Sequence, residues 1–579
     1  MFLTKVKHTA ANELRSPVSD VVVSVPAWFT DTQRRAIMDA AEIAGLKLLR
    51  LMNDTTATAL GYGITKSDLP TAEEKPRRVA FVDIGHSNYT CSIVAFRKGE
   101  LQVLSTAYDR HFGGRNFDKI LIDHFAVEFK EKYKIDIHSN PKAYLRVATG
   151  VEKMKKVLSA NAMAPLNIES VMNDIDVQTM LKREEFEELC KPLIDRARVP
   201  LEQALADAKL SVEDIDVVEV VGGCSRVPVL KEAISSFFAK SLSFTLNQDE
   251  AVARGCTWAC AILSPAFRVR DFSVHDIVSY PIEFTWEKSQ EIPDEDTNLT
   301  VFPKGNAVPS TKILTFYRKE PFDLEAKYAE PDKLPGKITP WIGKFSIKNV
   351  KPDPKDDFMI CKLKARVNLH GVLNVESGYY VEEVEVEEEI KDEENKDVSQ
   401  LPTAADSDAM DGDPQKSNRR SHSESSSPTS SSVSAKRPRL RDPMLIPEEH
   451  LQQAMDVDQQ QAGEQKPKYR KVRKQVKKGD LPVVAGTSAL DQVTKDIYIE
   501  MENTMAMEDK LVADTEDRKN ALEEYIYELR NKIEDVWAPF ASDSEKKRIQ
   551  EMTDASEVCS PSFHLFLKTN VWFTGMVIR

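Results

Sequence analysis

The chain has 579 residues and a mass of 65.3 kDa, too much for one hydrophobic core, so about three or four domains are expected. Its 79 basic and 93 acidic residues give a net charge of -14, which argues against nucleic-acid or anionic-membrane binding by the whole molecule. Seven scattered cysteines without paired metal-ligand spacing suit a reducing compartment. Because no apolar run reaches the roughly 18 residues of a membrane span, the composition predicts a cytoplasmic protein.

Residues 1–270 alternate strand-like apolar runs with helical patterns, as in the runs 21–25 and 48–52 with a helical stretch over 31–44 between them. Strands separated by helices of this length are typical of α/β architecture. Thr30 can cap that helix, and Gly45 stands where it should stop. This part of the chain is predicted to form an α/β domain.

Residues 271–385 change to short strands with alternating polarity. The hydrophobic residues of the segment 360–369 share one face of a strand: Cys361, Leu363, Ala365, Val367 and Leu369. His370 and Gly371 then provide a turn, and the chain returns through 372–375. The pattern predicts a separate β domain built on a half-buried antiparallel sheet.

Residues 386–485 are predicted to form an acidic, disordered insertion with a basic end, because they carry too little apolar surface to offset the entropy of ordering. The acidic run begins at 381–396, with nine acidic residues against two basic ones. Within the insertion, 436–441 resembles a nuclear import signal, and 466–478 holds eight basic residues in thirteen. Solvated charge that balances the acidic run is the favoured explanation of these basic segments.

Residues 486–554 return to a helical pattern that predicts a helix pair or the beginning of a bundle. One stripe of this pattern is apolar and is assigned to packing: Leu522, Tyr525, Ile526, Leu529, Ile533, Val536 and Trp537. The final stretch, 555–579, loses the periodicity and becomes a mixed apolar tail.

Three glycine-bearing segments occur in order, at 82–87, 112–115 and 220–228, and the first and third follow β-branched apolar runs. This pattern predicts strands that turn where only glycine lets the backbone approach a phosphate or a nucleoside. Asp83 precedes Gly85 and suits a carboxylate that holds a metal-bound water or accepts its proton. A β-turn explains an isolated Asp-x-Gly equally well. Together the three segments indicate a nucleotide cleft.

A second group of polar residues has helical spacing i, i+3, i+4 and i+7, which places a carboxylate, two cations and a hydroxyl on one face: Glu152, Lys155, Lys156 and Ser159. A solvated amphipathic helix accounts for that spacing equally well. Gly222 and Gly223 follow the apolar run 217–221, Arg226 can lie over a flat base or ribose, and Asp249 stands at a capped helix start.

Six segments together resemble the nucleotide-binding domain of the 70-kDa heat-shock chaperones: 25–29, 39–45, 53–57, 152–159, 221–223 and 249–252. Four features are closer to the large relatives of those chaperones, the heat-shock protein 110 family. They are Gly-His-Ser at 85–87, Gly-Gly-Arg-Asn-Phe-Asp at 113–118, the segment 316–322, and the long acidic insertion before the helices. The resemblance covers residues 1 to about 554.

This resemblance implies a multidomain protein with an α/β, actin-like (ribonuclease-H-like) nucleotide-binding domain, followed by an antiparallel β-sandwich and a C-terminal helical segment. The implied domains are an incomplete nucleotide-binding domain, a β-sandwich substrate-binding domain, the acidic insertion, the start of a helical bundle and an unmatched tail: 1–270, 271–385, 386–485, 486–554 and 555–579.

The resemblance also implies roles for individual residues. Asp83 matches the carboxylate near the metal and the attacking water, and the second phosphate loop matches Gly85, His86 and Ser87, with Gly113 and Gly114 in the glycine segment that follows. The nucleoside contacts of the second lobe match Glu152, Lys155, Lys156, Ser159, Gly222, Gly223, Cys224, Arg226 and Asp249. The implied cofactors are ATP or ADP with Mg²⁺.

Several departures from the smaller chaperones bear on hydrolysis. Their Gly-Gly-Gly-Thr loop corresponds to 85–88 here, so Asn88 replaces the threonine and Thr90 the following acidic residue. Asp54 replaces the usual glutamate, and 267–274 is charged where the smaller chaperones have a leucine-rich linker. The family's first phosphate loop and its assisting lysine precede the position matched by Met1, so we expect a shortened first lobe with exposed sheet edges, and also a shortened C-terminal end.

These observations predict a cytoplasmic co-chaperone that binds ATP, releases ADP from a 70-kDa heat-shock chaperone and holds unfolded client proteins, with at most weak ATPase activity. Nuclear import stays an open alternative because of the segment 436–441. Two other functions compete with this one. They are an ATP-hydrolysing foldase of the 70-kDa type and a passive holdase fragment that binds no nucleotide.

Overall fold

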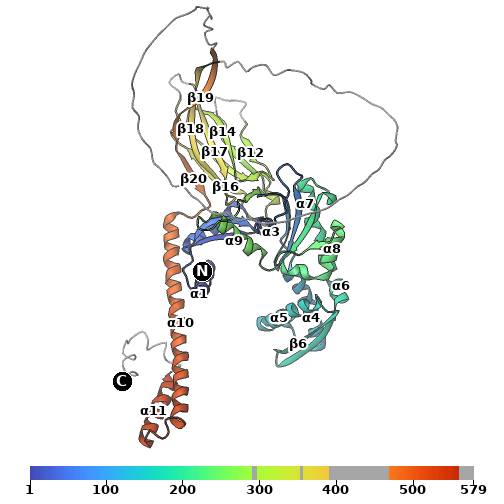
Figure 1. Ribbon diagram of the computed structural model, residues 1–579, viewed down its shortest axis with the longest axis vertical. Coiled ribbons are helices and arrows are strands. Elements are labelled where there is room, and N and C mark those ends of the chain that lie inside the picture. The colour runs from blue at the N-terminus through green and yellow to red at the C-terminus, as the bar shows by residue number, and fades with distance from the viewer. Residues whose placement is uncertain (290–295, 353–356, 390–468, 560–579) are drawn as a thin grey trace, which may run out of the picture. The chain divides into compact units, whose positions relative to one another are not determined.

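The structure is a computed structural model that describes residues 1–289, 296–352, 357–389 and 469–559 (Figure 1). The chain divides into two compact units, one formed by 1–382 with 477–579 and the other by 383–476. The segment resembling an import signal, 436–441, and the tail beyond 559 lie outside the described residues. No described helix is long and apolar enough to cross a membrane.

The first strands form a small parallel sheet. β1 (Asp20–Val25) pairs with β2 (Lys47–Asn53), and α2 (Asp31–Ile43) makes the crossover between them. A capping box between Thr30 and Gln33 starts α2, and Gly45 follows its end with φ +66°, as the sequence indicated. The helix α1 (Phe2–Leu14) precedes β1, and Lys7 donates to the carbonyls of Ala44 and Gly45 at 3.0 and 3.1 Å.

A seven-stranded mixed sheet is the centre of the α/β part, in the order β13-β10-β5-β4-β3-β8-β9. Its strands are β3 (Arg77–Ile84), β4 (Tyr89–Arg97), β5 (Glu100–Asp109), β8 (Val217–Val221), β9 (Leu242–Ser243), β10 (Ser273–Ile277) and β13 (Ala307–Val308). The parallel pairing of β10 with β5 means that the segment expected to open the β domain begins with a strand of this sheet.

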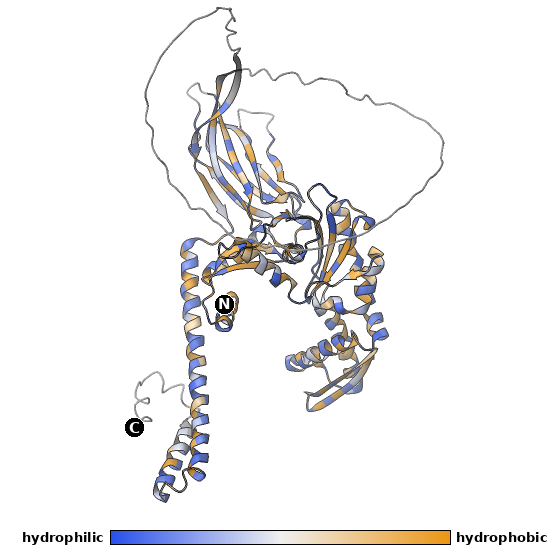
Figure 2. Ribbon diagram, in the orientation of Figure 1, coloured by the Kyte–Doolittle hydropathy of each residue, from blue (hydrophilic) through white to orange (hydrophobic). Residues whose placement is uncertain are grey.

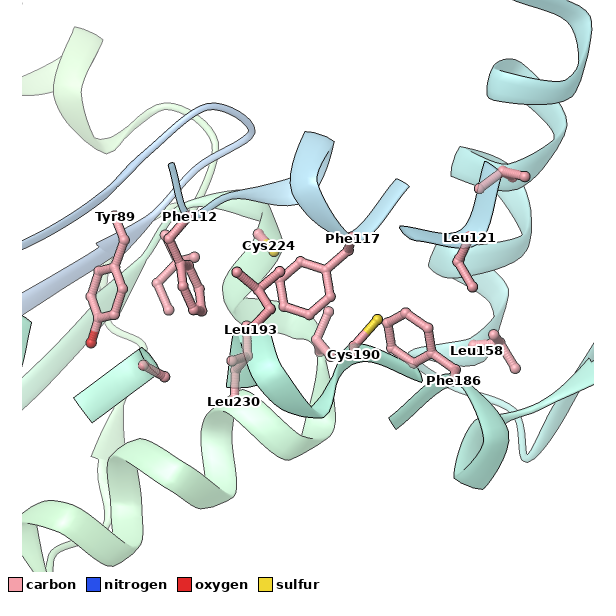
Figure 3. Close-up of a cluster of buried hydrophobic side chains, with 14 of the residues drawn as sticks. Tyr89, Phe112, Phe117, Leu121, Leu158, Phe186, Cys190, Leu193, Cys224 and Leu230 are labelled. Carbon is pink, nitrogen blue, oxygen red and sulfur yellow. The ribbon is translucent and has the colours of Figure 1, made fainter. Parts of the chain in front are cut away.

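Helices flank the sheet and supply much of its core: α3 (Asp54–Thr65), α4 (Gly114–Lys132), α5 (Pro141–Leu158), α6 (Arg183–Ile194), α7 (Val199–Ala208), α8 (Pro228–Phe238) and α9 (Ala251–Leu263). Figure 3 shows Phe117 and Phe186 within the largest buried cluster, which α4 and α6 help to build. The hairpin of β6 (Met163–Met172) and β7 (Ile175–Lys182) adds Leu166 and Val177 to the same cluster.

Two antiparallel sheets form the next part, which we call the two-sheet region. One has the order β12-β11-β15-β16-β20, with β11 (Ile282–Trp286), β12 (Asn298–Phe302), β15 (Phe322–Tyr328), β16 (Trp341–Ile347) and β20 (Val483–Thr487). The other has the order β14-β17-β18-β19, with β14 (Ser310–Arg318), β17 (Met359–Val367), β18 (Leu373–Glu389) and β19 (Tyr469–Leu481). Buried side chains from both sheets join one hydrophobic cluster.

The alternation expected along 360–369 is present in β17, and Figure 2 shows the alternating hydropathy of this region. Cys361, Leu363, Ala365 and Val367 are buried. Leu369 departs from the expectation and is 40% exposed, because the strand ends at Val367 and a turn follows. Gly371 has φ +73° in this turn, which makes glycine the suitable residue there.

Both ends of the segment expected as a disordered insertion are strands. β18 continues to Glu389, and β19 begins at Tyr469 as its neighbour in the sheet. Lys478 lies 3.0 Å from the carboxylate of Glu382, which pairs the basic strand with the acidic one. The interior, 390–468, lies outside the described residues.

The C-terminal described elements are α10 (Gln492–Glu534) and α11 (Asp543–Cys559), which contact each other. From the apolar stripe expected here, Ile526 and Ile533 are buried. Val536 and Trp537 are exposed by 62% and 41%, because α10 ends at Glu534 and they lie beyond it.

Candidate nucleotide-binding site

Asp83 lies near the end of β3, opposite Thr90 of β4 and Val221 of β8. Burial raises the pKa of its carboxyl group to about 6. Asp54, the first residue of α3, is also deeply placed, and burial together with the charge of Asp83 raises its pKa to about 7. Two carboxyl groups thus share one poorly solvated space at the end of the central strand.

The turn after β3 contains the first glycine segment. The N–H of Gly85 donates to the carbonyl of Asn88 at 3.0 Å, and the side-chain amide of Asn88 donates to Ser87 Oγ at 3.2 Å. The amide of Asn88 is therefore engaged within the turn itself. Ser87 accepts this bond, which ties the two polar side chains of the turn to each other.

The second glycine segment packs directly on the first. The N–H of Gly114 donates to the carbonyl of Gly85 at 3.0 Å, and the N–H of Arg115 donates to the carbonyl of His86 at 2.9 Å. A Cβ added at Gly113 would lie 2.5 Å from the carbonyl oxygen of His86. Glycine is needed at 113 because the two backbones approach closely, and not because of its φ.

The third glycine segment meets the same strand end. Gly222 has φ +84°, and an added Cβ would lie 2.4 Å from the carbonyl oxygen of Ile84 and 2.5 Å from Asp83 Oδ1. Its N–H donates to the carbonyl of Gln248 at 2.9 Å. Glycine is the only residue that satisfies both the backbone angle and the contact here.

The four polar residues expected on one face at the end of α5 do not all have the same environment. Lys155 is buried, with Nζ 2.6 Å from Asp118 Oδ1 and donating to the carbonyl of Gly114 at 3.1 Å. Lys156 instead pairs with Glu152 at 2.7 Å on the exposed side. Ser159 follows the helix and donates to the carbonyl of Lys155 at 3.2 Å, so its hydroxyl serves the helix end.

Arg226 and Asp249 form a two-bonded ion pair, with N–O distances of 3.1 and 2.6 Å. An added Cβ at Gly223 would lie 3.4 Å from both side chains. Arg226 is the main cause that lowers the pKa of Asp249, and the charge of Lys156 contributes. The pair borders a cavity of about 420 Å³ that Lys231 and Phe244 also line.

Cys224 does not face this cavity. Its side chain is buried among Phe112, Leu193 and Leu230 (Figure 3), and burial raises the pKa of its thiol to about 12. The side chain therefore contributes packing as a neutral thiol.

The structure thus connects most of the expected site. The first glycine segment contacts both the second and the third around the end of β3, and a Cβ added at Gly114 would lie 3.3 Å from Lys155 Nζ and 3.4 Å from His86 Nδ1. Sequence reasoning assigned no role to Asp118, the partner of Lys155, although it closes the segment 113–118 that supported the resemblance. Among the described residues, no three histidine, cysteine or acidic side chains cluster as a direct metal site.

Comparisons with known proteins identify the family of this chain. The family model described as "Hsp70 protein" matches residues 1–560. Heat shock protein hsp88 of Neurospora crassa is 59% identical over 551 residues, which are 95% of this chain and 69% of that protein. A heat shock protein homolog of Saccharomyces cerevisiae is 46% identical, over 96% of this chain and 71% of that protein.

A mammalian relative is similar to a comparable degree. Heat shock 70 kDa protein 4 of Rattus norvegicus is 46% identical over 554 residues, which are 94% of this chain and 63% of that protein. The expected resemblance is therefore confirmed over nearly the whole sequence. The chain belongs to the Hsp70 family of chaperones, in its heat-shock protein 110 branch.

Proposed function

We propose that this chain is a nucleotide-binding co-chaperone that accelerates ADP release from a 70-kDa heat-shock chaperone and holds unfolded client proteins. Family membership supports a chaperone role. The nucleotide-binding part of this proposal rests on three ion pairs near the glycine segments: Lys155 with Asp118, Lys156 with Glu152, and Arg226 with Asp249. These pairs hold the groups of the expected nucleoside side in place before a ligand arrives.

ATP or ADP with Mg²⁺ is the cofactor that this arrangement fits. Gly113 and Gly222 let the backbones of three loops meet at the end of β3 without side chains between them, so backbone N–H groups of these loops would be the phosphate donors. Asp54 and Asp83 would face the cation, which would neutralise two carboxylates that are costly to ionise in this space. Magnesium usually keeps several waters and binds phosphate oxygens, so a set of only two carboxylates suits it.

Slow hydrolysis follows from the same loops. The side chain of Asn88 donates to Ser87 and offers no hydroxyl to a metal-bound water. Asp83, with a pKa of about 6, is nevertheless ionised at neutral pH and able to accept a proton, which favours residual ATPase activity. In this proposal ATP acts mainly as a ligand that stabilises one conformation.

The proposed domains follow the described elements. Residues 1–270 bind nucleotide, although β10 adds 273–277 to the same sheet. The two-sheet region is the proposed substrate-binding β-sandwich. Its strands β11, β12 and β14 to β17 lie within 271–385, where β18 also begins, whereas β19 and β20 come later in the chain. The segment 386–485 is an insertion into that region whose ends are strands, and 486–554 forms the helices.

The exchange role is tested by adding the full chain to a 70-kDa chaperone loaded with fluorescent ADP and following its release. We expect acceleration that depends on ATP. Arg226→Ala should weaken ATP binding and reduce the effect, whereas Arg254→Ala should not, because Arg254 forms a similar ion pair with Glu250 on exposed surface. Unchanged ADP release with the unaltered chain would reject the exchange role.

Two further measurements separate the competing functions. Equilibrium binding of labelled ATP to the full chain distinguishes the proposal from a holdase that binds no nucleotide, for which no saturable binding is expected. Steady-state ATP hydrolysis, measured with peptide and a J-domain protein, tests the foldase alternative. Strong stimulation of hydrolysis by both additions would favour the foldase.

A further inference from the structure

A small cavity lies between the two-sheet region and the part formed by β1, α2 and β2, which we call the first lobe, and it is apart from the nucleotide loops. It has a volume of about 50 Å³ and is lined by Arg34 from α2, Arg50 from β2, Asp276 from β10 and Gly371 from the turn between β17 and β18. A buried water needs roughly 10 to 15 Å³ measured in this way, so the space holds about three to five waters. That is room for one small polyatomic ion.

Arg34 donates three hydrogen bonds on the wall of this cavity. Its Nε donates to the carbonyl of Phe29 at 3.1 Å, and its terminal nitrogens donate to the carbonyl of His370 at 3.3 Å and to Asn53 Oδ1 at 2.6 Å. Gly371 packs against the same guanidinium, because an added Cβ would lie 3.2 Å from one of its terminal nitrogens. Arg34 therefore has a structural role in this wall.

Asp276 is also engaged, and by neutral donors. Its Oδ2 accepts from Asn53 Nδ2 at 3.0 Å and from Thr56 Oγ1 at 2.8 Å, and its Oδ1 accepts from the N–H of Ile277 at 2.8 Å. Among the described residues no ion pair links Asp276 to Arg50, but burial lowers the pKa of both Arg34 and Arg50 and the charge of Asp276 opposes this. Asp276 is the only carboxylate among the described wall residues, and its hydrogen bonds come from neutral groups.

Arg50 is the exception on this wall. Its side chain donates no hydrogen bond to any described residue, and its Nε is buried without a partner. His370, nearby, is neutral because its Nδ1 accepts the N–H of Leu51 at 3.1 Å, and Tyr328 is held neutral by burial, which raises its pKa. The described wall residues carry two guanidinium groups and one carboxylate, a net positive charge, while Asp31 and Asp54 act on Arg34 from outside the wall.

We propose that this cavity is a binding site for a small tetrahedral oxyanion of the phosphate or sulfate class, held by the guanidinium of Arg50. A planar guanidinium binds such an ion through two parallel N–H donors, and an acceptor-only ligand satisfies the one wall group that lacks a partner. The bound ion joins β2, the β10 strand and the turn at 368–371, so it ties the two-sheet region to the first lobe. This site shares no residue with the proposed nucleotide cleft, although burial, Asp83 and then Asp276 and Arg34 of the cavity wall all influence the pKa of Asp54.

The direct test is equilibrium dialysis of the full chain against radiolabelled inorganic phosphate, with sulfate and chloride as competitors at matched ionic strength. We expect one saturable site that sulfate competes for and chloride does not. Arg50→Met should abolish that site, and Arg50→Lys should weaken binding by about tenfold or more, since an ammonium lacks the two-donor fork. Arg254→Met, at an exposed ion pair, is the matched control and should bind as the unaltered chain does.

Thermal unfolding provides the second readout. Phosphate should raise the melting temperature of the unaltered chain and of Arg254→Met, but not that of Arg50→Met. In chloride alone, Arg50→Met should melt no lower than the unaltered chain, because the substitution removes a poorly solvated charge without a hydrogen-bond partner. Phosphate binding that persists in Arg50→Met would place the ion elsewhere, such as at the phosphate loops, and would overturn the proposal. Absence of saturable binding would show that the cavity holds water only.

Discussion

Lys155 Nζ lies 2.6 Å from the carboxylate of Asp118, and this buried pair joins α5 to α4 directly beneath the second glycine segment. The side chains are 9% and 11% exposed. Lys155 also donates to the carbonyl of Gly114, so one ammonium fixes both the helix contact and the loop. The stability of the site therefore depends on a charge pair that has little access to water.

Removing one member of this pair should be costly. Lys155→Met leaves the Asp118 carboxylate buried without its counter-charge, and we expect a loss of about 3 to 5 kcal/mol in the free energy of unfolding. The double variant Lys155→Met with Asp118→Leu should recover most of that loss, because neither charge remains. Denaturant titration of the two single variants and the double variant measures the coupling. Additive losses would show that the two residues do not interact.

Asp54 and Asp83 predict a specific dependence of stability on pH. Burial raises both pKa values, to about 7 and about 6, above the ordinary value near 4. The folded chain therefore favours the protonated forms. Their contribution to stability is fully present below about pH 4 and is lost as the pH rises through 6 to 7.

Asp54→Asn removes one of these titrations. At pH 8 its free energy of unfolding should be about 4 kcal/mol higher than that of the unaltered chain, and the difference should vanish near pH 4. Chemical denaturation at several pH values, without nucleotide, checks this expectation. Asp68→Asn is a matched control, since that carboxylate is exposed and ion-paired with Arg77. An equal gain at both pH extremes would contradict the titration.

The sequence predicted the architecture around β3 well, because local patterns determine it. A β-branched run followed by glycine predicted that Asp83 and Gly222 lie at neighbouring strand ends. Alternating polarity predicted one buried face, formed by Cys361, Leu363, Ala365 and Val367. Such signals depend on a few adjacent residues. They can therefore be recognised without knowing which elements pack against them.

The burial of the Lys155 side chain could not be predicted in the same way. Helical spacing puts Lys155 and Lys156 next to each other, and only a partner on another helix decides which of them is buried. The strand character of 469–481 was missed for a similar reason. By itself this basic segment resembles a solvated loop. It is a strand because it pairs with the acidic strand β18, which lies before the insertion, and such a long-range pairing is not visible in local sequence.

That acidic and basic pairing leads to a prediction at the edge of the two-sheet region. Lys478 and Glu382 are both about half exposed, so their pair contributes only about 0 to 1 kcal/mol. Lys478→Glu places like charges across two strands and should speed amide hydrogen exchange in 477–481. The swap Glu382→Lys with Lys478→Glu should restore the slower exchange, and both effects should shrink in high salt. Unchanged exchange in the single variant would show that charge does not hold this strand.

Gly222 offers a test that separates backbone strain from close contact. Gly222 and Gly305 have nearly equal angles, φ +84° and +82°, but nothing lies within 4 Å of a Cβ built at Gly305, whereas one at Gly222 would meet Ile84 O at 2.4 Å and Asp83 Oδ1 at 2.5 Å. Gly305→Ala should therefore cost only the strain of a left-handed residue, about 1 kcal/mol.

Gly222→Ala should cost clearly more and should also abolish ATP binding, because the third glycine segment must move away from the end of β3. The free energy of unfolding and the affinity for labelled ATP are measured on both variants. Equal losses of stability would mean that the loop relaxes around the added methyl group. Unimpaired ATP binding by folded Gly222→Ala would remove this segment from the nucleotide site, whereas lost binding in Gly222→Ala alone would place the close approach of the three loops at the centre of ligand recognition.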